Sequence, residues 1–346
     1  MNRIHFLKIV SLLIVFVPGL FAQSEQRLAS YFEENPGADA NGDGVLTMQE
    51  ARDHRQGSTR RNDPSRGDNL SSVSEIKGID IPLSQAPLKE IELKSADGVD
   101  LSFAYRKPKG EGTFPTIIFF HGGGGQSNLE GLKKNLLSGA IQTRFLEKGY
   151  ATVQSTRRPY WVSKNKDQPT GFWDAVADAA LVVEKVKTLP GVDPERIILY
   201  GGSGGGILAI TTASKTEVAC VVAGEPATVV PLDPRTGESG GASEYRNVME
   251  DPKDFYPAAK RKETRAWMKK IHAPVLILQG DQTGLYKTNF EILIPEMKGL
   301  GKDISYIEFP GKSHGFYWGS TKTGATLETV EKIIRDVTGF IESHTQ

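Results

Sequence analysis

Ser203 is the residue whose surroundings point most directly to chemistry, because it stands among glycines in the stretch "RIILYGGSGGGILAI". A flexible Gly-Ser linker would be flanked by polar residues, whereas this stretch has apolar runs on both sides. A G-x-S-x-G pattern between an apolar strand and an apolar helix is typical of a tight turn that exposes the serine hydroxyl. Ser203 is therefore the predicted nucleophile of an acyl-transfer reaction.

A serine nucleophile needs a base, which is normally a histidine. His314, in "FPGKSHGF", directly follows the last predicted strand and is the predicted base. His121 ends the apolar run "TIIFFH", and we expect it to shape the following loop rather than to transfer protons. The other four histidines stand in the N-terminal leader, in a polar segment, before a strand and at the C terminus: His5, His54, His272 and His344.

A carboxylate must orient the base and stabilise its charged form. Asp281 ends the apolar run "VLILQGD", and the chain order Ser203, Asp281, His314 fits a nucleophile-acid-base arrangement. Glu225, in "VVAGEPAT", follows the preceding predicted strand and is the alternative acid. We prefer Asp281, because it stands in a loop immediately after a buried strand.

Acyl transfer also requires hydrogen-bond donors for the negative charge that develops on the carbonyl oxygen. The glycine-rich stretch "HGGGG" follows a buried strand, and its third residue, Gly123, is a predicted backbone donor. Gly204, directly after the nucleophile, is the second.

Elements that would hold these residues alternate along the chain from about residue 76 onward. Residues 88–108 predict a hairpin with an Asp97-Gly98 turn, and residues 129–148 an amphipathic helix. Apolar strands near residues 116–120, 150–156, 196–202, 218–224, 274–281 and 304–311 are separated by helical segments. This pattern predicts an α/β fold with a doubly wound, mainly parallel sheet, which binds ligands beyond the carboxyl ends of its strands.

From about Leu88 to the C terminus the chain resembles the α/β-hydrolase superfamily, in its dienelactone hydrolase and prolyl-oligopeptidase-like branch. The motifs that carry the resemblance are "FFHGGGG", "LPGVDPERIILYGGSGGG", "VLILQGDQT" and "FPGKSHGF". The resemblance implies the α/β-hydrolase fold and a serine hydrolase that uses no catalytic cofactor. Members of this branch are mostly esterases, with some peptidases, but prolyl-oligopeptidase-type enzymes carry a large N-terminal propeller. Here only residues 23–87 stand between the expected signal peptide, residues 1–22, and the core. A segment this short favours an esterase over a peptidase of that type.

Residues near the pocket mouth are expected in "STRRPYW", which follows the second parallel strand. Arg157 and Arg158 could bind a carboxylate or sugar hydroxyls, and Trp161 could stack on a sugar or aryl ring, although loop packing would explain them equally well. Residues 226–272 form an insertion between strands and a predicted lid.

The N-terminal residues have the layout of a signal peptide. Two basic side chains precede the apolar run Ile9 to Val17, and small residues end at Ala22. The run is shorter than the roughly 20 residues that a membrane-spanning helix needs. We therefore expect cleavage after residue 22, export to the periplasm or medium, and no membrane attachment of the mature chain.

Overall composition excludes some partners. Lys plus Arg and Asp plus Glu balance at 42 each, so no global charge favours nucleic acid or an anionic membrane. The single cysteine, Cys220, lies in the apolar run "VACVVAG" and is predicted to be a buried structural thiol.

Another motif stands at the front of the chain, where "DANGDGVLTMQE" fits a calcium-binding EF-hand loop. The predicted ligands are the side chains of Asp39, Asn41, Asp43 and Glu50 and the carbonyl of Val45. No second loop pairs with it, and "ENPGA" interrupts the entering helix, so we expect affinity on the order of 10⁻⁴ to 10⁻³ M. A structural or docking role for calcium is expected.

The predicted organisation is a signal peptide (1–22), an EF-hand-like segment (23–52), a polar linker (53–75) and a catalytic domain (76–346). The leading functional hypothesis is an exported serine esterase acting on small-molecule esters or on acyl or aryl esters of carbohydrates. The alternatives are a prolyl-oligopeptidase-like peptidase or amidase and, from another class, a calcium-dependent binding protein with a vestigial hydrolase core.

Overall fold

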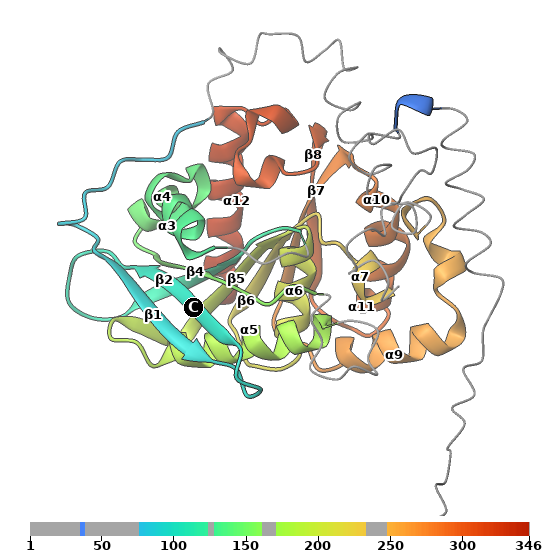
Figure 1. Cartoon of the computed structure of the whole chain (residues 1–346), viewed down its shortest axis with the longest axis horizontal. Coiled ribbons are helices and arrows are strands. Elements are labelled where there is room, and N and C mark those ends of the chain that lie inside the picture. The colour runs from blue at the N-terminus through green and yellow to red at the C-terminus, as the bar shows by residue number, and fades with distance from the viewer. Residues whose placement is uncertain (1–34, 39–75, 124–127, 161–170, 233–247, 346) are drawn as a thin grey trace, which may run out of the picture. The chain divides into compact units, whose positions relative to one another are not determined.

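The computed structural model describes residues 35–38, 76–123, 128–160, 171–232 and 248–345 (Figure 1). The chain divides into two units, Met1–Val73 and Ser74–Gln346. In the first unit only residues 35–38 are described, and they include the 3-10 turn η1 (Pro36–Ala38). The predicted signal peptide, the calcium loop Asp39–Glu50 and the linker 53–75 lie outside the described residues.

The described part of the second unit is built on an eight-stranded sheet with the order β1-β2-β4-β3-β5-β6-β7-β8. The strands β2–β1 and β2–β4 pair antiparallel, and all other neighbours pair parallel. This arrangement confirms the predicted mainly parallel sheet. The strands are β1 (Leu88–Lys94), β2 (Asp100–Arg106), β3 (Phe114–Phe120), β4 (Ala151–Ser155), β5 (Val192–Gly202), β6 (Cys220–Gly224), β7 (Val275–Gln282) and β8 (Ile304–Ser313).

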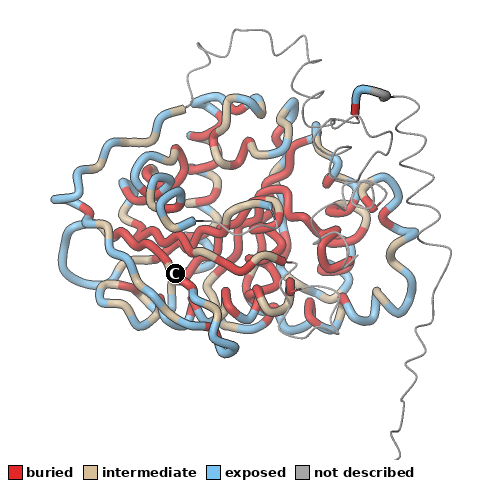
Figure 2. The backbone as a smooth tube through the Cα atoms, viewed as in Figure 1, coloured by how far each residue is buried: buried red, intermediate tan, exposed pale blue. Residues whose placement is uncertain are grey.

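Both faces of the central strands are buried, as the apolar runs predicted (Figure 2). Along β3, Ile118 and Phe120 join the core on one face, and Ile117 and Phe119 join the core on the other. Side chains alternate in this way because successive residues of a strand point to opposite sides. One core includes α5 (Phe172–Lys187) and α6 (Gly204–Thr212), and the other includes α4 (Ala140–Glu147) and α12 (Leu327–His344).

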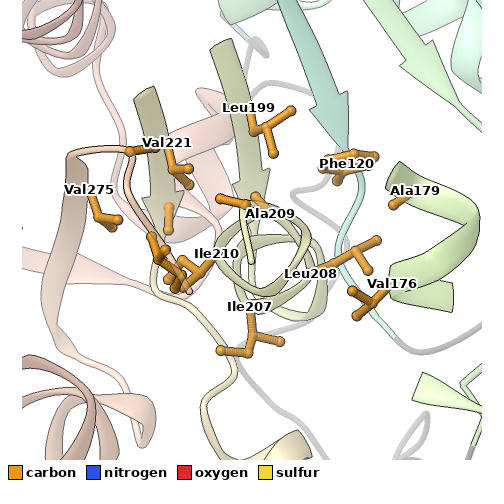
Figure 3. Close-up of a cluster of buried hydrophobic side chains, with 14 of the residues drawn as sticks. Phe120, Val176, Ala179, Leu199, Ile207, Leu208, Ala209, Ile210, Val221 and Val275 are labelled. Carbon is orange, nitrogen blue, oxygen red and sulfur yellow. The ribbon is translucent and has the colours of Figure 1, made fainter. Parts of the chain in front are cut away.

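The helix α6 is buried along its whole length, from Gly204 to Thr212. It packs between the sheet and α5, and its side chains Ile207, Leu208, Ala209 and Ile210 belong to one buried cluster with Val176 of α5 and Val221 of β6 (Figure 3). A helix that is apolar on all sides is stable only inside a core. The rigid packing of α6 holds the residue that precedes it, Ser203.

One predicted helix is two helices in the structure. The segment 129–148 forms α3 (Leu129–Ser138) and α4, which are separated by Gly139 in an extended conformation. A Cβ atom at Gly139 would lie 2.5 Å from the Asn135 carbonyl oxygen, so only glycine fits this close turn. The break lets α4 turn to pack against α12.

Smaller elements complete the second unit. The described parts of the predicted lid, 226–232 and 248–272, contain α7, η4 and α9, whereas residues 233–247 lie outside the description. These and the other short elements are α7 (Val229–Leu232), η4 (Pro252–Phe255), α9 (Ala258–Met268), α10 (Leu285–Thr288), η5 (Asn289–Leu293), α11 (Ile294–Lys298), η6 (Phe316–Trp318) and η7 (Thr321–Thr323).

Two further features concern burial and the membrane. Cys220 starts β6 and is fully buried, as predicted, and burial raises the pKa of its thiol to about 12. Within the ranges that the structure describes, no helix combines the length and the apolar character needed to cross a bilayer.

The candidate catalytic side chains, and the loop-shaping His121, stand at the carboxyl ends of parallel strands. His121 follows β3, Ser203 follows β5 and Glu225 follows β6, while Asp281 is the second-last residue of β7 and His314 follows β8. Parallel strands bring these ends to one edge of the sheet. The fold therefore gathers residues that are up to 193 positions apart in the sequence, from His121 to His314.

Candidate active site

Ser203 occupies a strained turn between β5 and α6. Its φ of 56° and ψ of −121° place it among the few described non-glycine residues with positive φ. The neighbouring glycines are required by close contacts: a Cβ at Gly202 would lie 2.1 Å from the Tyr317 ring, and one at Gly204 would lie 2.4 Å from the Gly123 carbonyl oxygen. The predicted turn is confirmed, and its strain is typical of a functional residue.

Backbone hydrogen bonds place Ser203 beside the end of β6. The Ser203 amide donates to the Gly224 carbonyl at 2.8 Å, and the Ala227 amide donates to the Ser203 carbonyl at 2.9 Å. Glu225 lies between these two contacts in the chain. The candidate nucleophile is thus fixed next to a carboxylate that follows the adjacent strand.

Glu225 is completely buried and binds His314. Its Oε2 lies 2.7 Å from His314 Nδ1 and accepts the Gly315 amide at 3.3 Å, while its Oε1 accepts the Gly280 amide at 3.1 Å. Glu225 also has a positive φ of 42°. A buried carboxylate needs such a set of donors, and this set orients the imidazole ring.

The preference for Asp281 as the orienting acid is corrected by these contacts. Asp281 is exposed, and its Oδ1 accepts the Gly311 amide at 2.8 Å, which joins β7 to β8. The alternative acid, Glu225, makes the contact with His314. Sequence order alone could not distinguish two carboxylates that follow neighbouring strands.

His314 is partly open to solvent, with 43% of its side chain exposed. Because its Nδ1 faces Glu225, its Nε2 is the nitrogen that could accept a proton. Within the described residues Nε2 lies 3.4 Å from the Tyr317 hydroxyl, a long contact, and shares no hydrogen bond with Ser203. Catalytic hydrogen bonds of this kind commonly tighten only when substrate binds.

Arg157 does not line the pocket mouth as predicted. It is 4% exposed and donates to the carbonyl oxygens of His121 at 3.0 Å, of Gly122 at 3.4 Å and of Gly123, as well as to the Tyr160 hydroxyl at 3.0 Å. Its guanidinium therefore supports the loop after β3 and is not presented to a substrate.

The prediction that Arg158 lies at the pocket mouth is also corrected. Arg158 is 3% exposed and forms ion pairs with two carboxylates. It contacts Asp97 at 2.7 and 2.8 Å and Asp178 at 2.9 Å. Its hydrogen bonds hold the pKa of Asp97 well below its usual range. Trp161, the third predicted substrate residue, lies outside the described residues.

The loop after β3 brings Gly123 close to Gly204, as the oxyanion-hole prediction requires. Gly123 has a φ of 72°, and its carbonyl oxygen lies against the Gly204 backbone. His121 Nδ1 lies 2.8 Å from the Gly122 carbonyl oxygen, so Nδ1 carries the proton. Burial, aided by the charge of Arg157, lowers the pKa of His121 to about 4, and the ring is neutral at neutral pH.

A cavity of about 280 Å³ adjoins this loop. Two of its lining atoms, His121 Nε2 and Gln154 Oε1, are buried and have no hydrogen-bond partner among the described residues. Both atoms accept hydrogen bonds, so the cavity suits a group that donates them. Its lining residues are His121, Asn135, Gly139, Gln142, Gln154 and Trp318.

The described residues contain no group of three or more His, Cys, Asp or Glu side chains that could hold a metal ion. The predicted calcium ligands lie outside the described residues: Asp39, Asn41, Asp43, Val45 and Glu50.

Comparison with known sequences identifies the family. Residues 104–287, just over half of the chain, match the sequence profile of the BD-FAE family. The chain belongs to the BD-FAE family. The matched region includes Ser203, Glu225 and Asp281 but ends before His314.

The quorum-quenching protein AidA of Acinetobacter baumannii (strain MDR-ZJ06) is a similar curated protein. It is 28% identical over 148 residues, which are 42% of this chain and 45% of AidA. The match thus spans less than half the length of that relative.

Solved esterase structures share the fold. Brefeldin A esterase, a bacterial homologue of human hormone-sensitive lipase, is 18% identical with a TM-score of 0.56, over 78% of this chain and 80% of its own. A thermostable esterase from Pseudomonas putida ECU1011 is 19% identical with a TM-score of 0.54, over 93% and 98%. These similarities establish the α/β-hydrolase fold.

Proposed function

We propose that this protein is a serine hydrolase that cleaves carboxylic esters through an acyl-enzyme. The observation that carries the proposal is the buried Glu225 carboxylate 2.7 Å from His314 Nδ1, next to the strained turn that holds Ser203. A nucleophile, a base and an orienting acid in this arrangement can perform acyl transfer without a metal. Membership of the BD-FAE family and the fold shared with esterases support the same reaction.

In the proposed reaction, His314 Nε2 takes the proton of the Ser203 hydroxyl as its oxygen attacks the ester carbonyl carbon. Glu225 holds the ring so that Nε2 faces the reaction and stabilises the imidazolium that forms. The amides of Gly123 and Gly204 bind the oxyanion. The imidazolium then protonates the departing alcohol, and a water activated by the same nitrogen releases the acid from Ser203.

The cavity beside the loop after β3 supports a substrate that carries hydroxyl groups. Its acceptors, His121 Nε2 and Gln154 Oε1, and its further carboxamides, Asn135 and Gln142, would bind several hydroxyls. We therefore include acyl or aryl esters of carbohydrates in the proposed substrate class. Rates measured on short-chain, feruloyl, acetyl-sugar and glucuronoyl esters would rank these substrates.

The Ser203→Ala variant tests the proposed function. Turnover of p-nitrophenyl acetate should fall by roughly 10⁴-fold, because the remaining site has no nucleophile. A fluorophosphonate probe should label the wild-type protein and not the variant. Near wild-type turnover in the variant would contradict the proposal. Faster cleavage of aminoacyl amides than of esters would favour a peptidase, and a wild-type protein that neither reacts with the probe nor turns over esters would favour the binding-protein hypothesis.

Export and calcium binding at Asp39–Glu50 remain part of the proposal. They rest on the sequence patterns at the start of the chain. Calorimetry of residues 23–346 with calcium up to several millimolar tests the calcium site. A titration without a heat of binding would contradict it.

A further inference from the structure

We propose that Arg157 and Tyr160 are positioning residues that join the two halves of the oxyanion hole. The inference rests on the proposed ester hydrolysis. The two donors, Gly123 and Gly204, come from separate elements, the loop after β3 and the first turn of α6. They must point at one oxygen atom to within a fraction of an ångström, so something has to hold the elements in register.

The first half is held through its carbonyl groups. The C=O and N–H of a trans peptide point in opposite directions, so the Gly122 carbonyl sets the direction of the Gly123 amide. That carbonyl accepts from His121 Nδ1 at 2.8 Å and from Arg157 Nη2 at 3.4 Å. Arg157 also holds the carbonyl groups on either side, those of His121 and Gly123. Three successive carbonyls thus face the guanidinium, and the Gly123 amide faces away from it.

The second half is held by Tyr160, which is 1% exposed. Its hydroxyl donates to the Gly204 carbonyl at 2.7 Å and accepts from Arg157 Nη1 at 3.0 Å. The Arg157 Cζ also lies 4.3 Å from the centre of the Tyr160 ring. Hydrogen bonds therefore run without a break from Gly123 through Arg157 and Tyr160 to Gly204.

The charge of Arg157 adds a second effect. A guanidinium remains protonated in proteins, so a full positive charge lies on the carbonyl side of the Gly122-Gly123 peptide. Donation to that carbonyl polarises the peptide and makes its N–H a stronger donor. The gain is largest when the oxyanion forms, so it should appear in the rate of the chemical step more than in substrate binding.

The chain contains matched control residues for both side chains. Arg106, 0% exposed, also donates to three backbone carbonyls, those of Ile81, Ala86 and Leu136. It pairs with Thr152 near the start of β4, at the sheet edge opposite the candidate active site.

Tyr105, 3% exposed, likewise donates to a backbone carbonyl, that of Pro190, at 3.3 Å. It lies next to Arg106 on β2.

The experiment compares Arg157→Lys and Tyr160→Phe with Arg106→Lys and Tyr105→Phe. The two Arg→Lys variants each replace a buried guanidinium, and the two Tyr→Phe variants each remove a buried hydroxyl. For p-nitrophenyl acetate we expect kcat to fall about 10- to 100-fold in Arg157→Lys and about 5- to 20-fold in Tyr160→Phe, with KM changed less than about threefold. Affinity for a trifluoromethyl ketone, which forms an oxyanion on the serine, should fall in proportion to kcat/KM. The control variants should keep kcat within about twofold at a comparable loss of Tm.

Equal kcat losses in the control and test variants of either pair would overturn the inference, as would ketone affinity that stays at the wild-type value. If Arg157→Lys does not fold, Tyr160→Phe decides, because it removes a single oxygen atom. A failure of the proposed function looks different: the wild-type protein itself would then show no turnover that depends on Ser203.

Discussion

Glu225 and Asp281 differ in what surrounds their carboxylates. The Glu225 carboxylate is buried and contacts three nitrogen atoms, the amides of Gly280 and Gly315 and the ring of His314, whereas Asp281 lies in solvent at the junction of β7 and β8. The energetic role of the two residues therefore differs, although both stand at the ends of neighbouring strands. Removing the charge at each should separate catalysis from local strand pairing.

Glu225→Gln should lower kcat/KM for p-nitrophenyl acetate by about 10² to 10⁴-fold, because the neutral amide no longer stabilises the charged form of His314. Asp281→Asn should leave kcat/KM within about threefold and reduce thermal stability slightly. Steady-state kinetics and thermal unfolding of both variants check this. The reverse ranking of the two kcat/KM values would restore Asp281 as the acid.

The His121 ring should make stability depend on pH. Its pKa is about 4 in the folded chain, against 6.5 for an ordinary histidine, so between these values the unfolded chain binds more protons. Acidification from pH 7 to pH 5 should therefore destabilise the fold by about 2 kcal/mol through this group alone. Urea unfolding at both pH values should show this loss in the wild type and a loss smaller by that amount in His121→Asn. An identical pH dependence in the two proteins would contradict the assignment.

At the level of single residues, the sequence predicts the location of those residues that directly follow a strand. Ser203 follows an apolar, buried strand and His314 follows the last predicted strand, and the structure places both residues at the same sheet edge. For Arg157 and Arg158 the sequence leaves substrate binding and loop packing open, and the structure shows loop packing. Their partners, the carbonyls after β3 and the carboxylates Asp97 and Asp178, are distant in sequence.

At the scale of elements, the turn from β5 into α6 requires glycine because neighbouring loops approach it closely. Gly204 begins α6 in contact with the Gly123 carbonyl oxygen, so the helix and the loop after β3 have no room for a side chain between them. Glycines inside a helix usually destabilise it relative to alanine. Here the close approach outweighs that cost.

Gly204→Ala should therefore displace the loop after β3 and lower kcat by about 10-fold or more, because the added Cβ would stand 2.4 Å from the Gly123 oxygen. Gly339 provides the control, since it is exposed in α12 and a Cβ added there would meet no atom within 4 Å. Gly339→Ala should raise stability by about 0.5–1 kcal/mol and leave kcat unchanged. Kinetics and chemical denaturation distinguish these effects. Unchanged kcat in Gly204→Ala would mean that the loop yields without cost.

Strand and helix assignment from periodicity succeeded for the hairpin β1–β2 and for the parallel strands, whose apolar runs are long and bounded by glycine or proline. The break at Gly139 was missed because α3 and α4 continue the same amphipathic spacing. The close approach of the Asn135 carbonyl and the Gln142 side chain, which leaves no room for a Cβ at Gly139, does not show in the spacing of apolar residues.

At the scale of the whole second unit, Arg158 connects three parts of the fold. It bridges Asp97 in the β1–β2 turn and Asp178 in α5, and itself follows β4. When a buried cation shared by two carboxylates is removed, the carboxylates are left with uncompensated negative charge, and the folded state is strongly destabilised. The contacts of Arg158 with these two carboxylates do not involve Ser203, Glu225 or His314.

Arg158→Met should lower the free energy of unfolding by about 3 kcal/mol while kcat stays within about twofold at temperatures where the variant is folded. Arg335→Met is the comparison, since Arg335 is 70% exposed in its pair with Asp336 and should contribute less than about 1 kcal/mol. Denaturant unfolding and kinetics of both variants check this. A large fall in kcat for folded Arg158→Met would return Arg158 to the substrate site.

The solitary thiol of Cys220 gives the molecule a built-in reporter. It is the first residue of β6, an interior strand of the sheet, and none of its surface is exposed; its pKa of about 12 keeps it protonated and unreactive while the fold is closed. A thiol reagent can therefore modify the chain only when the core that β6 forms with α4 and α12 opens around Cys220. The rate of modification would measure how often this core opens in the native protein, in the absence of denaturant and without any added label.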